Sequence, residues 1–126
     1  MSDFKQLLVW QKAQAMSLDA HHVASRIRGR DNWRLRSQII GAAQSVPATI
    51  VEGTAQESSK EFSRYLRISL NSTTELEHHL LTARGLRVVK DADSLSLMSQ
   101  VIEVRKMLYG LLRYLRTRRK KDKEDQ

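Results

Sequence analysis

The sequence contains no cysteine, a single proline and five glycines among its 126 residues, and only 6% of its residues are aromatic. Without cysteine the chain forms no disulfide bond and offers no thiolate to a metal ion. Scarce proline and glycine leave few positions for tight turns, which argues against a β-sandwich or a β-barrel. These absences favour a helical protein.

Long hydrophobic runs are also missing. No segment approaches the roughly 20 apolar residues with which a helix crosses a bilayer. The first residues, MSDFKQLLVWQKAQ, lack the basic region and the long apolar run of a signal peptide. We therefore expect a protein that makes no membrane contact and is located in the cytoplasm.

The sequence does contain an excess of positive charge. Its 22 Lys and Arg residues outnumber 14 Asp and Glu residues, which gives a formal net charge of +8. Such a surplus favours anionic partners such as nucleic acid, although a basic surface can also serve solubility alone. Hydrophobic residues make up 40% of the chain, which is enough for the core of one domain.

Apolar residues recur at spacings of three and four in four segments, which predicts four amphipathic helices. The first helix should run from about Lys5 to Arg28, with Gly29 as its stop. The second should start near Trp33 and the third should follow a capping box formed by Ser58 and Glu61.

Glycines and capping residues predict the remaining helix boundaries. Asp31 or Asn32 can cap the second helix, which should end at Gly53. Gly85 is the expected end of the third helix. Three residues are candidate caps of the fourth: Asp91, Asp93 and Ser94.

The expected core faces follow the same periodicity. Pro47 lies inside the second helix and should kink it, because proline lacks a backbone donor and presses on the preceding turn. The third helix should bury Phe62, Leu66, Ser69, Thr73, Leu76, Leu80 and Ala83. The fourth should bury Leu95, Met98, Ile102, Leu108, Leu112 and Leu115.

Four such helices joined by short links predict an all-α, antiparallel up-down four-helix bundle. A solenoid of two helical hairpins is the alternative, but the sequence has no internal repeat that would support it. We expect the bundle to occupy residues 1–116 and a charged tail to occupy residues 117–126.

The predicted topology gathers basic residues at both ends of the bundle. Arginine suits phosphate because its planar guanidinium offers paired donors. A solvated polar face and ion pairing between subunits are the alternatives. Aromatic residues are few and are not interleaved with the basic ones, so binding should use phosphates rather than base stacking. The candidate nucleic-acid-binding residues are Arg26, Arg28, Arg30, Arg34, Arg36, Lys60, Arg64, Arg67, Arg113, Arg116, Arg118, Arg119, Lys120 and Lys121, with Arg84 and Arg87 near the first group.

Two pairs with a spacing of three residues, Asp19–His22 and Glu75–His78, superficially match a di-metal carboxylate bundle. Such a site needs every ligand to point inward, whereas His78 lies two residues from each of two expected core leucines. We therefore expect no metal and no cofactor. The sequence also lacks a glycine-rich phosphate loop and a nucleophile elbow, so we expect no enzyme.

An apolar surplus predicts self-association. Residues 7–10 are four consecutive apolar residues, which cover nearly the whole circumference of a helix. A second apolar stripe accompanies the expected core stripe of the fourth helix, and such surpluses mark partner surfaces. A wide core face is the alternative. The candidate oligomer interface comprises Leu7, Leu8, Trp10, Leu97, Val104, Leu111 and Tyr114.

Three segments carry a resemblance to a known family: LVWQKA at residues 8–13, SQIIGAAQSVPATIVEG at 37–53 and SKEFSRYLRISLNSTTELE at 59–77. Their order and spacing resemble the four-helix bundle proteins encoded in intervening sequences of large-subunit ribosomal RNA genes. The resemblance implies a homopentameric ring. It also extends distantly to accessory proteins of diversity-generating retroelements, which bind nucleic acid and a reverse transcriptase.

The sequence thus predicts a non-catalytic, oligomeric helical bundle that binds DNA or RNA through basic surfaces as an accessory or assembly protein. The alternative is a scaffold that recruits a partner enzyme without contacting nucleic acid.

Overall fold

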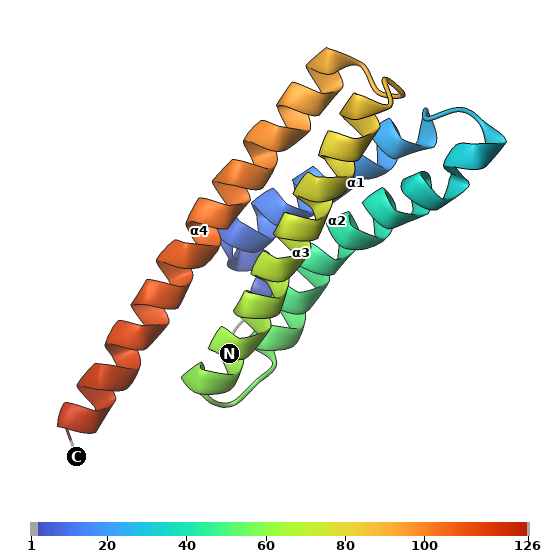
Figure 1. Ribbon diagram of the computed structural model, residues 1–126. Coiled ribbons are helices and arrows are strands. Elements are labelled where there is room, and N and C mark those ends of the chain that lie inside the picture. The colour runs from blue at the N-terminus through green and yellow to red at the C-terminus, as the bar shows by residue number, and fades with distance from the viewer. Residues whose placement is uncertain (1–2, 126) are drawn as a thin grey trace.

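The protein is an up-down four-helix bundle, as the sequence predicts. The computed structural model describes residues 3–125. Its helices are α1 (Leu8–Ser25), α2 (Trp33–Thr54), α3 (Ser59–Gly85) and α4 (Asp91–Glu124), and short 3₁₀ helices at Phe4–Gln6 and Arg30–Asn32 precede α1 and α2. Each helix packs against its neighbour in the chain, and α1 packs against α4 to close the bundle (Figure 1). None of these helices is long and apolar enough to cross a membrane.

One hydrophobic core runs along the bundle axis. The predicted face of α3 is confirmed, since all seven of its residues are buried. Met16 of α1, Ile39 of α2 and Leu66 of α3 are long aliphatic side chains, and all three are fully buried. Burial of such side chains is the main stabilising contribution to a bundle of this size.

The predicted core face of α4 is wrong in its first half. Leu95 is 62% exposed and Ile102 is 48% exposed, whereas Leu97 and Val104 are each 1% exposed. The predicted face jumped six residues from Ile102 to Leu108, which no helical face permits. The observed face keeps spacings of three and four throughout. It comprises Ser94, Leu97, Val101, Val104, Leu108, Leu112 and Leu115.

Leu97 and Val104 are therefore not part of an oligomer interface, contrary to the prediction. Both belong to the hydrophobic core cluster. The apolar residues that α4 leaves on its surface are instead Leu95, Ile102, Tyr109 and Tyr114.

The ends of α1 lie inside the predicted range of Lys5 to Arg28. The extended backbone of Leu7 separates the 3₁₀ helix from α1. At the other end Arg26 caps α1, and Gly29 follows with a φ of 103°. Gly29 therefore redirects the chain toward α2, and this left-handed conformation suits glycine because it has no Cβ.

The first residues of α2 and α3 show how caps act. Ser58 caps α3 as predicted, since its hydroxyl accepts a hydrogen bond from the backbone N–H of Glu61. The carboxylate of Glu61 meanwhile accepts from Arg64. The Asn32 amide does not cap α2 in the predicted sense but donates to the carbonyl of Arg28, which holds the α1–α2 link together.

The α2 helix continues without a break through Pro47, and the buried face continues through it at Val46, Thr49 and Ile50. The Thr49 hydroxyl donates to the carbonyl of Ser45, and the Ser69 hydroxyl of α3 donates to the carbonyl of Val46. Both bonds lie close to Pro47, but neither replaces its missing N–H, which in an α-helix would donate to the carbonyl four residues earlier. A kink at Pro47 stays a prediction.

Gly53 lies inside α2 rather than beyond it, because the helix ends at Thr54. A Cβ atom on Gly53 would lie 2.8 Å from Cδ1 of Phe62 and 3.1 Å from Cβ of Tyr65. The glycine is therefore required for the close approach of α2 to α3.

Replacing Gly53 with alanine should lower the free energy of unfolding by about 1–3 kcal/mol, because Phe62 is buried and α3 must shift. Gly41 is the matched control in the same helix, since its Cβ would meet no described atom within 4 Å. Gly41→Ala should raise the free energy of unfolding by roughly 0.5–1 kcal/mol through helix propensity. Urea unfolding followed by circular dichroism measures both, and equal effects of the two changes would contradict this account.

The α3 helix ends at Gly85 as predicted, but another residue makes the turn. Arg87 has a φ of 58°. The Val88 N–H donates to the Ala83 carbonyl, and the Arg87 N–H donates to the Arg84 carbonyl. These two bonds form a Schellman motif, in which glycine usually takes the left-handed position.

The α4 helix begins at Asp91, so Asp91 and Asp93 lie in its first turn, where carboxylates interact favourably with the helix dipole. It continues to Glu124, so the segment expected to be a charged tail from residue 117 is helical. Gln126, the last residue of that expected tail, lies outside the described residues, as do residues 1–2 of the expected bundle. Figure 1 shows the C-terminal end of α4 extending past the start of α3.

Candidate nucleic-acid interface

Two of the candidate arginines at the α1–α2 end have structural partners. Arg26 forms an ion pair with Asp93 at 3.0 Å, which connects α1 to α4. Arg36 donates to the backbone carbonyls of Ile27 and Gly29 at 2.9 and 3.0 Å. Arg36 thereby satisfies carbonyl groups beyond the end of α1. Through these contacts both side chains help to hold the fold together.

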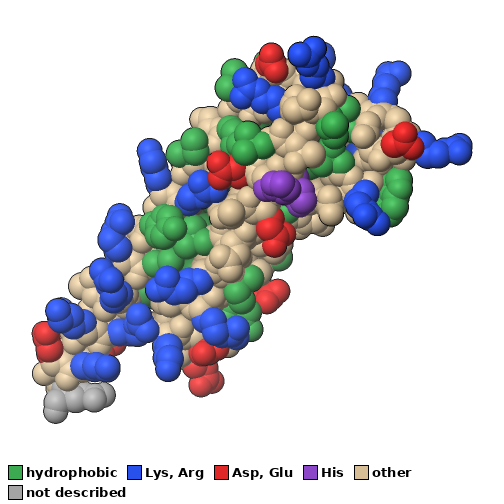
Figure 2. Space-filling model, viewed as in Figure 1, with side chains coloured by type: hydrophobic (Ala, Val, Ile, Leu, Met, Phe, Trp, Pro, Cys, Tyr) green, Lys and Arg blue, Asp and Glu red, His purple; other side chains and the backbone are tan. Residues whose placement is uncertain are grey.

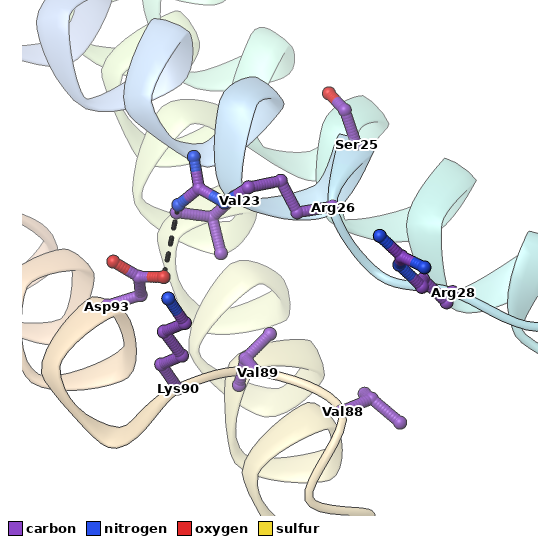
Figure 3. Close-up of a pocket in the computed structure, with 8 residues that line it drawn as sticks. All are labelled: Val23, Ser25, Arg26, Arg28, Val88, Val89, Lys90 and Asp93. Carbon is purple, nitrogen blue, oxygen red and sulfur yellow. Dashed lines mark hydrogen bonds and ion pairs between the residues drawn. The ribbon is translucent and has the colours of Figure 1, made fainter.

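A cleft of about 490 Å³ lies at this end of the bundle, lined by residues of α1, of the α1–α2 and α3–α4 links and of α4. In Figure 3 Arg26 reaches toward Asp93, Lys90 lies beside that carboxylate, and Arg28 points away along the α1–α2 link. The cleft therefore mixes charges of both signs. Arg28 lines this cleft and is exposed, and the other candidates at this end of the bundle are exposed as well: Arg30, Arg34, Arg84 and Arg87.

The strongest concentration of positive charge is on the C-terminal half of α4. Between Val104 and Lys121 the sequence has eight Lys and Arg residues and no Asp or Glu. Five of the six candidates here are exposed and Arg119 is half-buried. In Figure 2 Lys and Arg side chains gather over the part of this face where the end of α4 and the start of α3 lie.

Most of these charges have no acidic partner. Arg113, Arg116 and Lys120 form no ion pair with any residue of the described range 3–125. Spacings of three and four place them on one stripe of α4. Unpaired, exposed cations on one stripe keep their full charge available to a polyanion.

The start of α3 adds three candidates to the same end of the bundle. Arg64 pairs with Glu61 at 3.1 Å and lies over the ring of Tyr65, with 4.6 Å between the guanidinium carbon and the ring centroid. The hydrogen bond and the charge of Glu61 raise the pKa of Arg64 above its ordinary value. Lys60 and Arg67 are exposed and form no ion pair with any described residue.

A groove between α3 and α4 lies next to this basic stripe. It has a volume of about 350 Å³ and is lined by Arg67, Leu70, Asn71, Thr74, Arg105 and Tyr109. Arg105 is fixed in it, because its guanidinium donates to Glu77 at 2.7 Å and to the hydroxyl of Thr73 at 3.4 Å. We call the groove and the exposed cations Lys60, Arg67, Arg113, Arg116 and Lys120 the α3–α4 basic surface.

Sequence reasoning missed Arg105 and Tyr109, which belong to this surface. Neither lies near the α3 residues of the groove along the chain. Only the antiparallel packing of α3 against α4 brings them together. For Tyr109 the sequence did contain a signal. It lies four residues before Arg113, and residues four apart on a helix share a face.

The profile of the 23S rRNA-intervening sequence protein family matches residues 5–110. This chain belongs to that family. The match ends before Arg113, so the most basic part of α4 lies beyond it. None of the curated proteins compared with this chain matches it.

The fold of this family member also resembles a crystal structure from Bacteroides thetaiotaomicron, described as a protein of unknown function from the S23 ribosomal protein family. The two have a TM-score of 0.78 and 19% sequence identity, and the alignment covers 83% of this chain and 98% of the other. At this identity the likeness shows the shared fold.

The exposed apolar residues of this 23S rRNA-intervening sequence protein gather partly along α1 and α4. Lys12 pairs with Glu103 at 3.6 Å. Leu8 lies one turn before Lys12 on α1 and Met107 lies one turn after Glu103 on α4, so antiparallel packing puts both on the same side of this ion pair. Leu111 and Tyr114 continue this side of α4. We call these residues, Leu8, Met107, Leu111 and Tyr114, the α1–α4 seam.

Other predicted interface residues lie closer to the core. Leu7 and Trp10 are half-buried against it, and the Trp10 ring contacts Phe4 edge to face at 5.0 Å between centroids. Trp33, which was not a predicted interface residue, is 59% exposed at the start of α2.

The residues of the hypothetical metal site are dispersed in this family member. Asp19 of α1 accepts a hydrogen bond from Gln100 of α4. Within residues 3–125 no three His, Asp or Glu side chains lie close enough together to hold a metal ion. Partial burial, and secondarily the charge of His78, lower the pKa of His79 below its ordinary value.

Proposed function

We propose that this protein is a non-catalytic, oligomeric nucleic-acid-binding protein that contacts phosphates through the α3–α4 basic surface. The observation that carries the proposal is the stretch from residue 104 to 121, where eight cations and no carboxylate occupy one continuous helix. Lysine and arginine on a rigid helix suit repeated phosphates, because each contact releases condensed counterions.

The opposite end of the bundle supports phosphate binding less well. There Arg26 and Arg36 are committed to Asp93 and to backbone carbonyls. A charge held by an internal partner gains less from a phosphate, because the phosphate must replace that partner. We therefore place the phosphate contacts at the end of the bundle that carries the α3–α4 basic surface.

A salt titration of binding to duplex DNA and to RNA tests the proposal on the unmodified protein. The logarithm of the binding constant should fall linearly with the logarithm of the salt concentration, with a slope of about −0.9 per neutralised phosphate on duplex DNA. Binding that is absent at low salt would refute the proposal and favour a scaffold that binds only protein.

We further propose that the chain forms a homo-oligomer through the α1–α4 seam. Leu8 is 58% exposed and Tyr114 is 56% exposed, and both flank half-buried apolar residues. Contiguous apolar surface of this kind is typical of protein interfaces. The α3–α4 basic surface lies on the other side of α4 and stays open in such an assembly. Five subunits follow from the family resemblance alone.

Leu8→Asp should shift the mass measured by light scattering toward that of the monomer, because a buried, unpaired carboxylate opposes association. Leu18→Asp is the matched control, since Leu18 lies on another side of α1 and is 52% exposed. It should leave the mass unchanged. A monomer mass for the unmodified protein at micromolar concentration would contradict the oligomer, and dissociation by Leu18→Asp alone would move the interface elsewhere on α1.

A protein-binding scaffold is the second candidate function. Leu81 of α3 and Leu95 and Ile102 of α4 are each about half exposed or more. A partner helix that buries them would not need the basic residues. Binding of nucleic acid in the salt titration separates the two candidates.

A further inference from the structure

We propose that the α3–α4 groove holds one unpaired base of a single-stranded nucleic acid, stacked on the ring of Tyr109. This inference rests on the proposed function and specifies its ligand. The groove places an aromatic ring, a fixed guanidinium and a free amide around one hollow of about 350 Å³. These are the groups that proteins use to hold a base that has left its stack.

Tyr109 supplies the stacking surface. Its side chain is 49% exposed although it lines the groove, so one part of the ring is available to a ligand. Its hydroxyl donates no hydrogen bond to any residue between 3 and 125. A base stacks on such a ring whatever its identity, because every base has a π-face.

Arg105 and Asn71 define the other walls. The ion pair with Glu77 and the bond to Thr73 hold the guanidinium of Arg105 in place before any ligand arrives. The pair is partly shielded, with 27% and 37% of the two side chains exposed. Asn71 is exposed, and its amide can both donate to and accept from a base edge.

The phosphates of the same strand have partners on both sides of the groove. Arg67 lines the groove itself, and Arg113 follows Tyr109 by one turn on α4. Glu77 is already neutralised by Arg105, so no free carboxylate faces this part of the groove among the described residues that line it. A strand along α4 can therefore place a base on Tyr109 and its flanking phosphates on these arginines.

The geometry selects single strands over duplexes. In a duplex each base is stacked on its neighbours and paired, so its faces are not available to a side chain. The groove between the antiparallel helices α3 and α4 has a volume of about 350 Å³, which is room for a base but not for a double helix. Duplex contacts use the phosphate-binding cations alone.

Replacing Tyr109 with leucine tests the base site. We expect affinity for a single-stranded oligonucleotide to fall about tenfold, since loss of one stacked base typically has an effect of this size. Affinity for duplex DNA, and for a single strand of abasic sites with the same number of phosphates, should stay within about twofold. Tyr109→Phe keeps the ring and should keep the affinity.

Trp33→Leu is the matched control, because Trp33 is an exposed aromatic residue that lies outside both the groove and the α1–α4 seam. It should change no affinity for the base-containing strand, and circular dichroism should show all three variants folded. No loss for Tyr109→Leu, or an equal loss on abasic and base-containing strands, would overturn the base site while leaving the phosphate contacts intact. Absence of binding by the unmodified protein to every probe would overturn both proposals.

Discussion

Replacing Leu97 with alanine should lower the free energy of unfolding by about 3 kcal/mol, whereas the same change at Leu95 should alter it by less than about 0.5 kcal/mol. The two leucines are two positions apart on α4. Leu97 is 1% exposed within the core, and Leu95 is 62% exposed. Truncating Leu97 removes buried methyl groups and leaves a cavity in a close-packed interior. Truncating Leu95 removes groups that already contact water.

Urea unfolding measures both variants. The protein concentrations must match, because the stability of an oligomer depends on concentration. A larger loss for Leu95 than for Leu97 would show that the α4 register is wrong and would restore the face first expected from the sequence. Val104→Ala provides an independent check, since Val104 is also 1% exposed and lies two turns further along the helix.

Replacing Arg113, Arg116 and Lys120 together with alanine should weaken nucleic-acid binding by about 100-fold at low salt. Each contact between a cation and a phosphate contributes about 1 kcal/mol, so three contacts contribute about 3 kcal/mol. The salt slope on duplex DNA should become shallower by about 2.7, which is three times 0.9. Filter binding or fluorescence anisotropy over a salt series measures both quantities. Sequence preference should not change, because phosphates carry no sequence information.

The matched control removes the same charge from the other end of the bundle. Replacing Arg30, Arg34 and Arg84 with alanine also lowers the formal net charge from +8 to +5, which is eight minus three. This variant should lose far less affinity if the α3–α4 basic surface is the binding site. Equal losses in the two variants would indicate binding through net charge alone, and a greater loss in the control would place the site at the α1–α2 end.

Sequence periodicity determined the helices and most of the core. The three-and-four spacing of apolar residues predicted α2 from Trp33 and seven of the ten buried residues of α3, and it missed Ser63, Leu70 and Ser72. These predictions succeeded because burial of one helical face is a local pattern that packing against any neighbour must respect. Ser58 likewise accepts a hydrogen bond from a backbone N–H three residues away, so its capping role can be predicted from the nearby sequence alone.

The tertiary structure alone decided which surface residues work together. Two apolar stripes compete on α4, and packing against α1 and α3 buried the one that contains Leu97. The pairing of Arg26 with Asp93, and the meeting of Asn71 with Tyr109 in one groove, join residues of different helices. A sequence pattern reports the face on which a side chain lies. The partner of that side chain depends on how the helices pack and in which register, and long-range contacts set both.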